Sequence, residues 1–379
     1  MKAFDRLMVH VAERPAQIRS LKERGTTIIG YVPNGYLPEE LLYASGALPL
    51  GLLRGGDHAA VIAAESCMHR FVDTFCRAQI GYRLLGKELL YQLPDLLVAA
   101  YTDRNQFAIG EMWQHYTDVP IFKMDVPRYN RAEHALAYYH QGLVILRQRL
   151  EQHLRCDISD ADLNREIEVS NRIRNLLKII GETRKQEVPP ISGSQFVRLN
   201  HATYYADRKV LADALTSMTN ELPGASVDGS PRVRLMVIGS TLAEGDYRAI
   251  EMLEQYGAGI VFEEFAEGVH HYWQPVVPGN DPLMALAHRY LTKRTPPAFF
   301  KNVYPERRDF YLDKIGEYRV DGVLWYSLLY RDSYDREAIS FSRELQERGI
   351  PFLKISSDYD TAETEAMRTR IEAFLETIG

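Results

Sequence analysis

The first third of the chain alternates short apolar runs with segments that are apolar on one side only. A β-branched run at residues 26–32 ends at a turn, Pro33–Gly35, which predicts a strand followed by a loop. Pro38 then opens a predicted helix with Glu39 and Glu40 in its first turn, where the helix dipole favours acids. The pattern predicts strands at 26–32, 47–52, 95–100 and 120–124 and helices at 39–44, 66–90 and 106–116. Strands separated by helices in this way are typical of a parallel sheet.

The middle of the chain lacks strand patterns. From residue 131 to 218 apolar residues recur at helical spacing, and Ser159 with Asp162 forms an S-x-x-D signal for the start of a helix. Residues 4–24 also have helical spacing. Pro15 predicts an interruption of that first helix, because proline cannot donate a helical hydrogen bond.

A second series of strands and helices follows a stretch rich in turn-forming residues, 222–231, which predicts a linker. The predicted strands are 234–238, 259–262, 320–326 and 351–355, and the predicted helices are 247–256, 334–347 and 364–378. The predicted fold class is therefore α/β, with two Rossmann-like parallel-sheet units joined by a helical segment. The predicted domains are residues 1–130 with the N-terminal helix, the helical residues 131–222, and residues 232–379.

Composition narrows the class of protein. The 379 residues are 46% hydrophobic and 25% charged, which is typical of globular proteins. A formal charge of −6 argues against nucleic-acid binding, which needs a concentrated excess of lysine and arginine. No apolar run reaches the roughly 20 residues that cross a bilayer, and the N-terminal residues carry no apolar signal segment. We therefore expect no membrane span and a cytoplasmic location.

The chain has three cysteines, Cys67, Cys76 and Cys156, which are too few and too unevenly spaced for a disulfide framework. Cys67 and Cys76 form a C-x8-C pair. That spacing lacks the tight C-x2-C pattern of zinc sites and simple ferredoxin clusters. Taken alone, the cysteines therefore favour ordinary buried thiols.

Five stretches in a fixed order resemble the family of 2-hydroxyacyl-CoA dehydratase and benzoyl-CoA reductase D-components. They span most of the chain and are similar to the family's P-x-E-L helix, its D-G-V-I and G-I-P-x-L strands and its T-R-I-E-A-F closing helix. The stretches are Gly30–Pro33, Pro38–Pro49, Asp321–Leu324, Glu347–Leu353 and Thr369–Phe374.

The resemblance implies a 4Fe-4S cluster held by three cysteines. Cys76 matches the first of them and is the predicted metal ligand of this chain. The second and third cysteines each precede an aspartate in the family, and here Thr102 precedes Asp103 while Arg331 precedes Asp332. Neither a threonine hydroxyl nor a guanidinium replaces a cluster thiolate. The prediction is a cluster in the assembled complex and an incomplete cluster site in this chain alone.

Cys76, Thr102 and Arg331 remain the predicted cofactor-binding residues. At the mouth of a sheet crevice, Arg331 can bind a phosphate or carboxylate, and Thr102 can add a hydroxyl donor. The alternative is an ion pair between Arg331 and Asp103 or Asp332. Both interpretations stay open at the level of sequence.

Other residues could add ligands or acid–base chemistry. Cys67, Cys156 and the pair His270–His271 are possible ligands, although ordinary use is favoured for the histidines because adjacent strand residues point to opposite faces. Glu40 matches the family's P-x-E-L acid and is the predicted catalytic general base.

The resemblance implies a subunit of an enzyme that acts on an acyl-CoA thioester by one-electron radical chemistry. The implied partners are a homologous cysteine-bearing subunit and an ATP-dependent activator protein. Two alternatives remain. One is a non-catalytic assembly or regulatory paralogue of such an enzyme, and the other is a cluster-free CoA-ester-binding protein.

Overall fold

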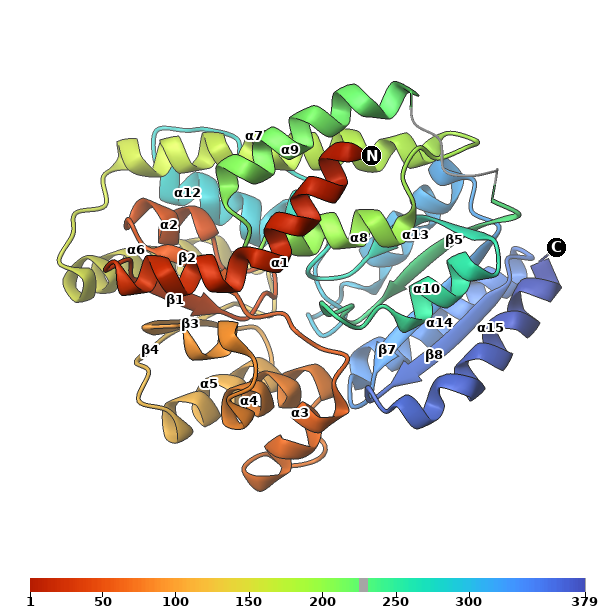
Figure 1. Ribbon diagram of the computed structural model, residues 1–379, viewed down its shortest axis with the longest axis horizontal. Coiled ribbons are helices and arrows are strands. Elements are labelled where there is room, and N and C mark those ends of the chain that lie inside the picture. Colours follow the sequence, from red (N-terminus) through yellow and green to blue (C-terminus); the bar gives the residue numbers. More distant parts are fainter. Residues whose placement is uncertain (225–230, 379) are drawn as a thin grey trace.

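The computed structural model of the chain describes residues 1–224 and 231–378. Figure 1 shows two sheets beside each other, with helices around them. Most of the predicted linker, residues 225–230, lies outside the described residues. Both sheets are parallel throughout and have four strands each, which confirms the predicted α/β class with two Rossmann-like units.

The first sheet has the strand order β2-β1-β3-β4. Its two central strands are almost completely buried, as expected for a parallel sheet covered by helices on both faces. Its strands are β1 (Ile28–Tyr31), β2 (Leu48–Gly51), β3 (Leu96–Tyr101) and β4 (Ile121–Asp125), and its helices are α2 (Glu39–Ala44), α3 (His58–Ala63), α4 (Thr74–Leu85) and α5 (Arg104–Tyr116).

The second sheet repeats this topology with the order β6-β5-β7-β8. Its strands are β5 (Val233–Gly239), β6 (Ala258–Glu264), β7 (Gly322–Leu328) and β8 (Phe352–Ser357). Its helices are α10 (Arg248–Gln255), α11 (Val269–Tyr272), α12 (Pro282–Ala287), α13 (Tyr304–Tyr318), α14 (Asp332–Glu347) and α15 (Thr364–Ile378), and a π-helical turn, His288–Thr292, follows α12. The segment from α11 to this turn, residues 269–292, extends away from the second sheet and packs on helices α6 and α7, which follow the first sheet in the chain.

The middle segment is helical, as predicted. It consists of α6 (Ala135–Leu154), α7 (Asp160–Glu182), α8 (Gly193–Ala202) and α9 (Arg208–Glu221). The predicted start signal is confirmed, since Ser159 and Asp162 form a reciprocal capping box at the beginning of α7. Figure 1 shows α7, α8 and α9 along one side of both sheets.

Two predicted helices differ from the structure. The first helix, α1 (Lys2–Glu23), continues through Pro15 without interruption. Its two ends are held by packing, because Phe4 and Leu7 belong to the core of the second unit and Ile18 to the core of the first. The helix predicted at 66–90 begins only at Thr74, because Asp73 caps its N-terminus and the preceding residues form a loop.

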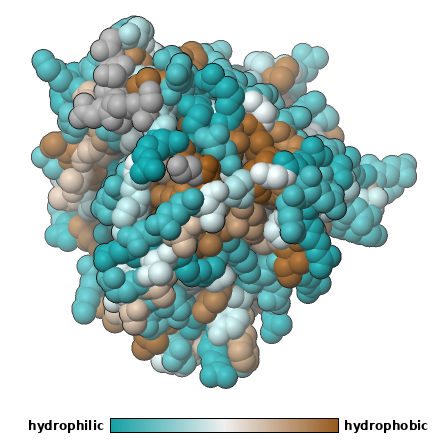
Figure 2. Space-filling model, turned by 90° about the vertical axis from the view of Figure 1, so that its right-hand side faces the viewer, coloured by the Kyte–Doolittle hydropathy of each residue, from teal (hydrophilic) through white to brown (hydrophobic). Residues whose placement is uncertain are grey.

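The outer surface of the second unit is mostly hydrophilic, with small areas of apolar side chains between charged ones (Figure 2). Within the described ranges, none of the helices combines the length and apolar character that a membrane span requires.

Candidate functional site in the crevice between the sheets

The carboxyl ends of β3 and β7 come together in a crevice between the two units. Asp103 follows β3 and caps α5 by accepting hydrogen bonds from the amides of Asn105, at 2.7 Å, and Gln106, at 3.0 Å. Arg331 follows β7 in the other unit and donates from Nη1 to Oδ2 of Asp103 at 3.1 Å. In parallel sheets ligands bind at such carboxyl ends, so this crevice is the candidate functional site.

A second carboxylate holds the same guanidinium. Asp73 caps α4, accepts a hydrogen bond from the amide of Cys76 at 3.0 Å, and is fully buried. Its Oδ2 lies 3.5 Å from Nε of Arg331, close enough for an ion pair although not aligned as a hydrogen bond. Burial alone would lower the pKa of Arg331, but Asp73 and Asp103 raise it above its ordinary value. Arg331 therefore links two helix caps of the first unit to the second unit.

Cys76 and Thr102 lie behind this ion-paired arginine. Cys76 is in the first turn of α4 and fully buried, and burial followed by the charge of Asp73 raises the pKa of its thiol well above the ordinary value. Thr102 is also buried, and its hydroxyl has no hydrogen-bond partner among the described residues. The predicted cofactor-binding residues therefore gather around Asp73 and Asp103, which the sequence pattern did not identify as a pair.

In front of the arginine, the crevice opens into a pocket of about 380 Å³. One part of its wall is aromatic, with Phe71, Phe299 and Tyr330, and the rest is polar. The polar part holds two arginines and two acids, namely Arg104, Arg331, Asp103 and Asp332. Tyr330 has a φ of 68°, a left-handed conformation that is unfavourable for a residue with a side chain. Backbone strain of this kind is concentrated at binding and catalytic sites, so it supports the assignment of the pocket as functional.

Glu267 is a further ionisable group near the crevice that sequence reasoning missed. It follows β6, is buried, and accepts a hydrogen bond from the amide of Leu242. Burial raises the pKa of Glu267 to about 8, although Leu242 and Arg331 act in the opposite direction. The signal in the sequence is an acid placed shortly after the carboxyl end of a strand: Glu267 lies three residues after β6, as Arg331 lies three residues after β7.

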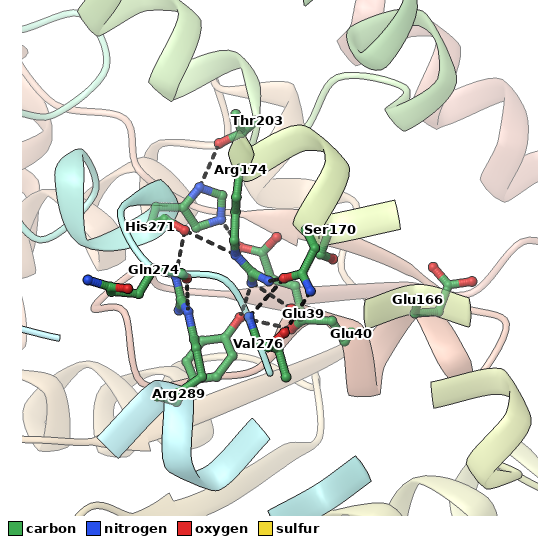
Figure 3. A network of polar contacts seen from close by, with 12 residues as sticks. Glu39, Glu40, Glu166, Ser170, Arg174, Thr203, His271, Gln274, Val276 and Arg289 are labelled. Atoms are coloured by element: carbon green, nitrogen blue, oxygen red, sulfur yellow. Dashed lines mark hydrogen bonds and ion pairs between the residues drawn. The ribbon is translucent and has the colours of Figure 1, made fainter. Parts of the chain in front are cut away.

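Glu40, the predicted general base, lies elsewhere, in a buried polar network (Figure 3). Its Oε1 accepts a hydrogen bond from Arg174 at 2.5 Å and its Oε2 accepts one from Tyr290 at 2.8 Å. Burial alone would raise the pKa of Glu40, but Arg174 and Arg289 lower it to about 2. A carboxylate with so low a pKa is a weak base, and Glu40 is not on the wall of the 380 Å³ pocket.

The remaining candidate ligands do not converge. His270 and His271 lie on the short helix α11, so the expectation of a strand at this point is wrong. His270 contacts Glu264, and burial lowers its pKa to about 4, whereas His271 contacts Glu39 at 3.2 Å. Among the residues that the structure describes, no group of three or more His, Cys, Asp or Glu side chains could hold a metal ion.

Comparison with known proteins agrees with this architecture. The sequence model of the 2-hydroxyglutaryl-CoA dehydratase D-component family matches residues 34–378. The match covers nearly the whole chain, including every strand of the two sheets except β1 and the residues of the crevice between them. The protein therefore belongs to this family.

Similar proteins are named as subunits of larger enzymes. The chain is 24% identical to a putative dehydratase subunit of Escherichia coli over 366 residues, which cover 95% of this chain and 94% of the relative. It is 20% identical to the beta subunit of (R)-phenyllactyl-CoA dehydratase of Clostridium sporogenes, over 97% of this chain and 96% of the relative. It is 23% identical to one of the subunits of benzoyl-CoA reductase of Thauera aromatica, over 93% of this chain and 90% of the relative.

The donor set of the crevice does not fit the iron–sulfur cluster that the resemblance implies. Such a cluster is held by thiolates, whereas Cys76 is a buried thiol with a raised pKa. The position matched to the third cysteine holds the guanidinium of Arg331, which is already paired with Asp73 and Asp103. Two carboxylates around a cation form an environment for positive charge, and a cluster with thiolate ligands is negatively charged.

Proposed function

We propose that this chain is a subunit of a complex related to 2-hydroxyacyl-CoA dehydratases and benzoyl-CoA reductases. The complex acts on a CoA thioester by one-electron radical chemistry. This chain contributes one wall of the substrate site, while a homologous cysteine-bearing subunit holds the 4Fe-4S cluster and an ATP-dependent activator protein delivers the electron. The relatives are named as subunits of acyl-CoA enzymes, which supports a shared site of this kind.

The observation that carries the proposal is the crevice pocket of about 380 Å³. The aromatic part of its wall suits an acyl chain or ring, and Arg104 is exposed beside it to meet an anionic group of the ligand. In our proposal Arg331, Asp73 and Asp103 keep the two units at a fixed separation, so that the pocket retains its shape. Glu267 is proposed as an ionisable side chain of the site, because burial raises its pKa to about 8.

The ion-paired Arg331 also favours a second candidate function. A guanidinium fixed between two carboxylates at the position of a cluster cysteine suits a protein without a cluster of its own. Such a protein either binds CoA esters without a cluster or is a paralogue that assembles and regulates a cysteine-bearing enzyme. Under this alternative Cys76 is a structural thiol, and the predicted ligand role of Cys76 is not needed.

Iron analysis separates the two candidates. We expect the isolated chain, expressed anaerobically, to carry no stoichiometric iron or acid-labile sulfide, whereas the complex with a cysteine-bearing homologue carries both and is active. Stoichiometric iron in the isolated chain would contradict our assignment of the cluster to the partner. A complex that keeps its iron and its full activity when this chain is omitted would favour the regulatory alternative.

Filling the pocket tests the substrate site directly. Ser333 lies on the pocket wall in the first turn of α14, and Ser333→Trp should lower the affinity for acyl-CoA by roughly tenfold or more, because the indole occupies the space of the acyl group. Ser340→Trp, on the exposed side of the same helix, is the matched control. Isothermal titration with an acyl-CoA compares the two variants, and equal affinities would rule out this pocket as the acyl site.

A further inference from the structure

A second pocket, of about 260 Å³, lies between α11, the π-helical turn with the residues that follow it, and the beginning of α13. It shares no lining residue with the crevice pocket. Three cations lie on its wall, namely Arg289, Lys293 and Arg294. Glu306, the one acid among the described residues of the wall, is already in an ion pair with Arg131.

Two of these cations are buried without a carboxylate of their own. Arg289 is 2% exposed and Arg294 is 7% exposed. Within the described part of the chain, Arg289 donates only to backbone carbonyls, those of Gln274 at 3.1 Å, His270 at 3.1 Å and His271 at 2.6 Å. Among the described residues, no carboxylate lies within ion-pair distance of Arg289.

Arg294 is held in a similar way. It donates to the carbonyl of Gly35 and lies over the ring of Tyr36, 4.4 Å from its centroid, while its Nε has no partner among the described residues. A buried charge without a counter-charge is strongly unfavourable, so two such guanidiniums on one pocket wall leave a positive site that favours an anion.

The carboxylate that acts on Arg289, Glu40, does not cancel this site. Glu40 acts on Arg289 from a distance, but Glu40 is bound to Arg174, and Arg174 repels Arg289. Burial and this repulsion lower the pKa of Arg289 to about 10, which is the expected effect of excess positive charge. Figure 3 shows Arg289 at the edge of the polar network, with its guanidinium toward Gln274 and away from Glu40.

The local backbone supports a binding role. Arg289 lies within the π-helical turn, and such turns are rare and occur frequently at functional sites. Lys293 directly follows the turn and is exposed, so it marks the entrance of the pocket.

From these observations we propose that the 260 Å³ pocket binds a phosphate-class oxyanion. The planar donors of Arg289 and Arg294 suit a tetrahedral oxyanion, and Lys293 adds charge at the rim. A doubly charged phosphate balances the two buried guanidiniums better than a single carboxylate does. The site goes beyond the proposed acyl-CoA function and does not depend on it.

Binding of inorganic phosphate to the full chain tests the proposal. In phosphate-free buffer, we expect saturable stabilisation by phosphate and pyrophosphate in thermal denaturation and titration calorimetry. Lys293→Glu should weaken that binding by roughly tenfold, because it reverses the charge at the entrance. Lys209→Glu, an equal charge change at an exposed position of α9, should leave the affinity unchanged.

A variant of the buried arginine gives a second measurement. Arg289→Lys keeps a positive charge but loses the planar fork, and it should also weaken phosphate binding if it folds. Absence of binding at about 10 mM phosphate in the unchanged protein, or equal losses in Lys293→Glu and Lys209→Glu, would overturn the proposal. Chloride at matched ionic strength controls for general salt effects.

Competition identifies the source of the phosphate group. If free CoA displaces phosphate and Lys293→Glu weakens CoA binding, the pocket takes a phosphate of the CoA moiety. If phosphate binds and CoA does not compete, the ligand is a free anion, and both outcomes support an oxyanion site. Ser333→Trp should leave phosphate binding intact, so failure of the acyl-site proposal is distinguishable from failure of this one.

Discussion

Arg331→Met should destabilise the protein by about 3–5 kcal/mol, the usual cost of removing one partner of a buried ion pair. The substitution keeps much of the side-chain volume but leaves Asp73, which is fully buried, and Asp103 without their shared cation. Both carboxylates belong to the first unit, whereas Arg331 belongs to the second. Denaturation in urea measures the loss, and we expect the contact between the two units to weaken first.

Two further variants make the result specific. Arg331→Lys should recover only part of the stability, because a point charge cannot reach both carboxylates as the planar guanidinium does. Arg308→Met removes an exposed arginine paired with Asp309 and should change the stability by less than about 1 kcal/mol. Equal effects of Arg331→Met and Arg308→Met would contradict the crevice ion pair.

Glu40→Gln should also cost about 3–5 kcal/mol, because it leaves Arg174 buried without its partner next to Arg289. The two interpretations of Glu40 differ in what they predict for this variant. A structural ion pair predicts a loss of stability, whereas a general base predicts a loss of kcat with unchanged stability. Glu344→Gln, which removes half of a surface pair with Arg348, is the matched control.

The pH dependence of stability tests the ion pair of Glu40 and Arg174 independently. The pKa of Glu40 is about 2 in the folded protein and about 4.3 in an unfolded chain. Its contribution to stability is therefore fully present above pH about 4.3 and is lost as the pH falls toward about 2. Glu40→Gln should show a shallower fall of stability in that window, and an unchanged slope would mean that Glu40 is not ionised in the folded state.

Much of the fold could be predicted from the sequence because its signals are local. The β-branched run at 26–32 contains β1, and the S-x-x-D signal at Ser159 marks the start of α7 where the structure has it. Pro15 misled the prediction, since packing of α1 at both ends outweighs one missing hydrogen bond. The family was also predictable, because it depends on the order of several short stretches.

The site was less predictable because its contacts are distant in sequence. An ion pair between Arg331 and Asp103 was one of two open alternatives, and the structure contains it. The second partner, Asp73, is separated from Arg331 by more than half the chain and carries no motif of its own. Glu267 has a raised pKa only because the fold buries it, and no local pattern reports burial of that kind.

The helix α1 has a consequence for the order in which the protein matures. Phe4 and Leu7 at its beginning pack in the core of the second unit, and the helix lies along α9, whose residues are made about 200 positions later. At the usual speed of ribosomes this delay is ~10–40 s. During synthesis the first sheet can form before the partner of α1 has been made, so the start of α1 reaches its final place after the sheet that follows it in the chain.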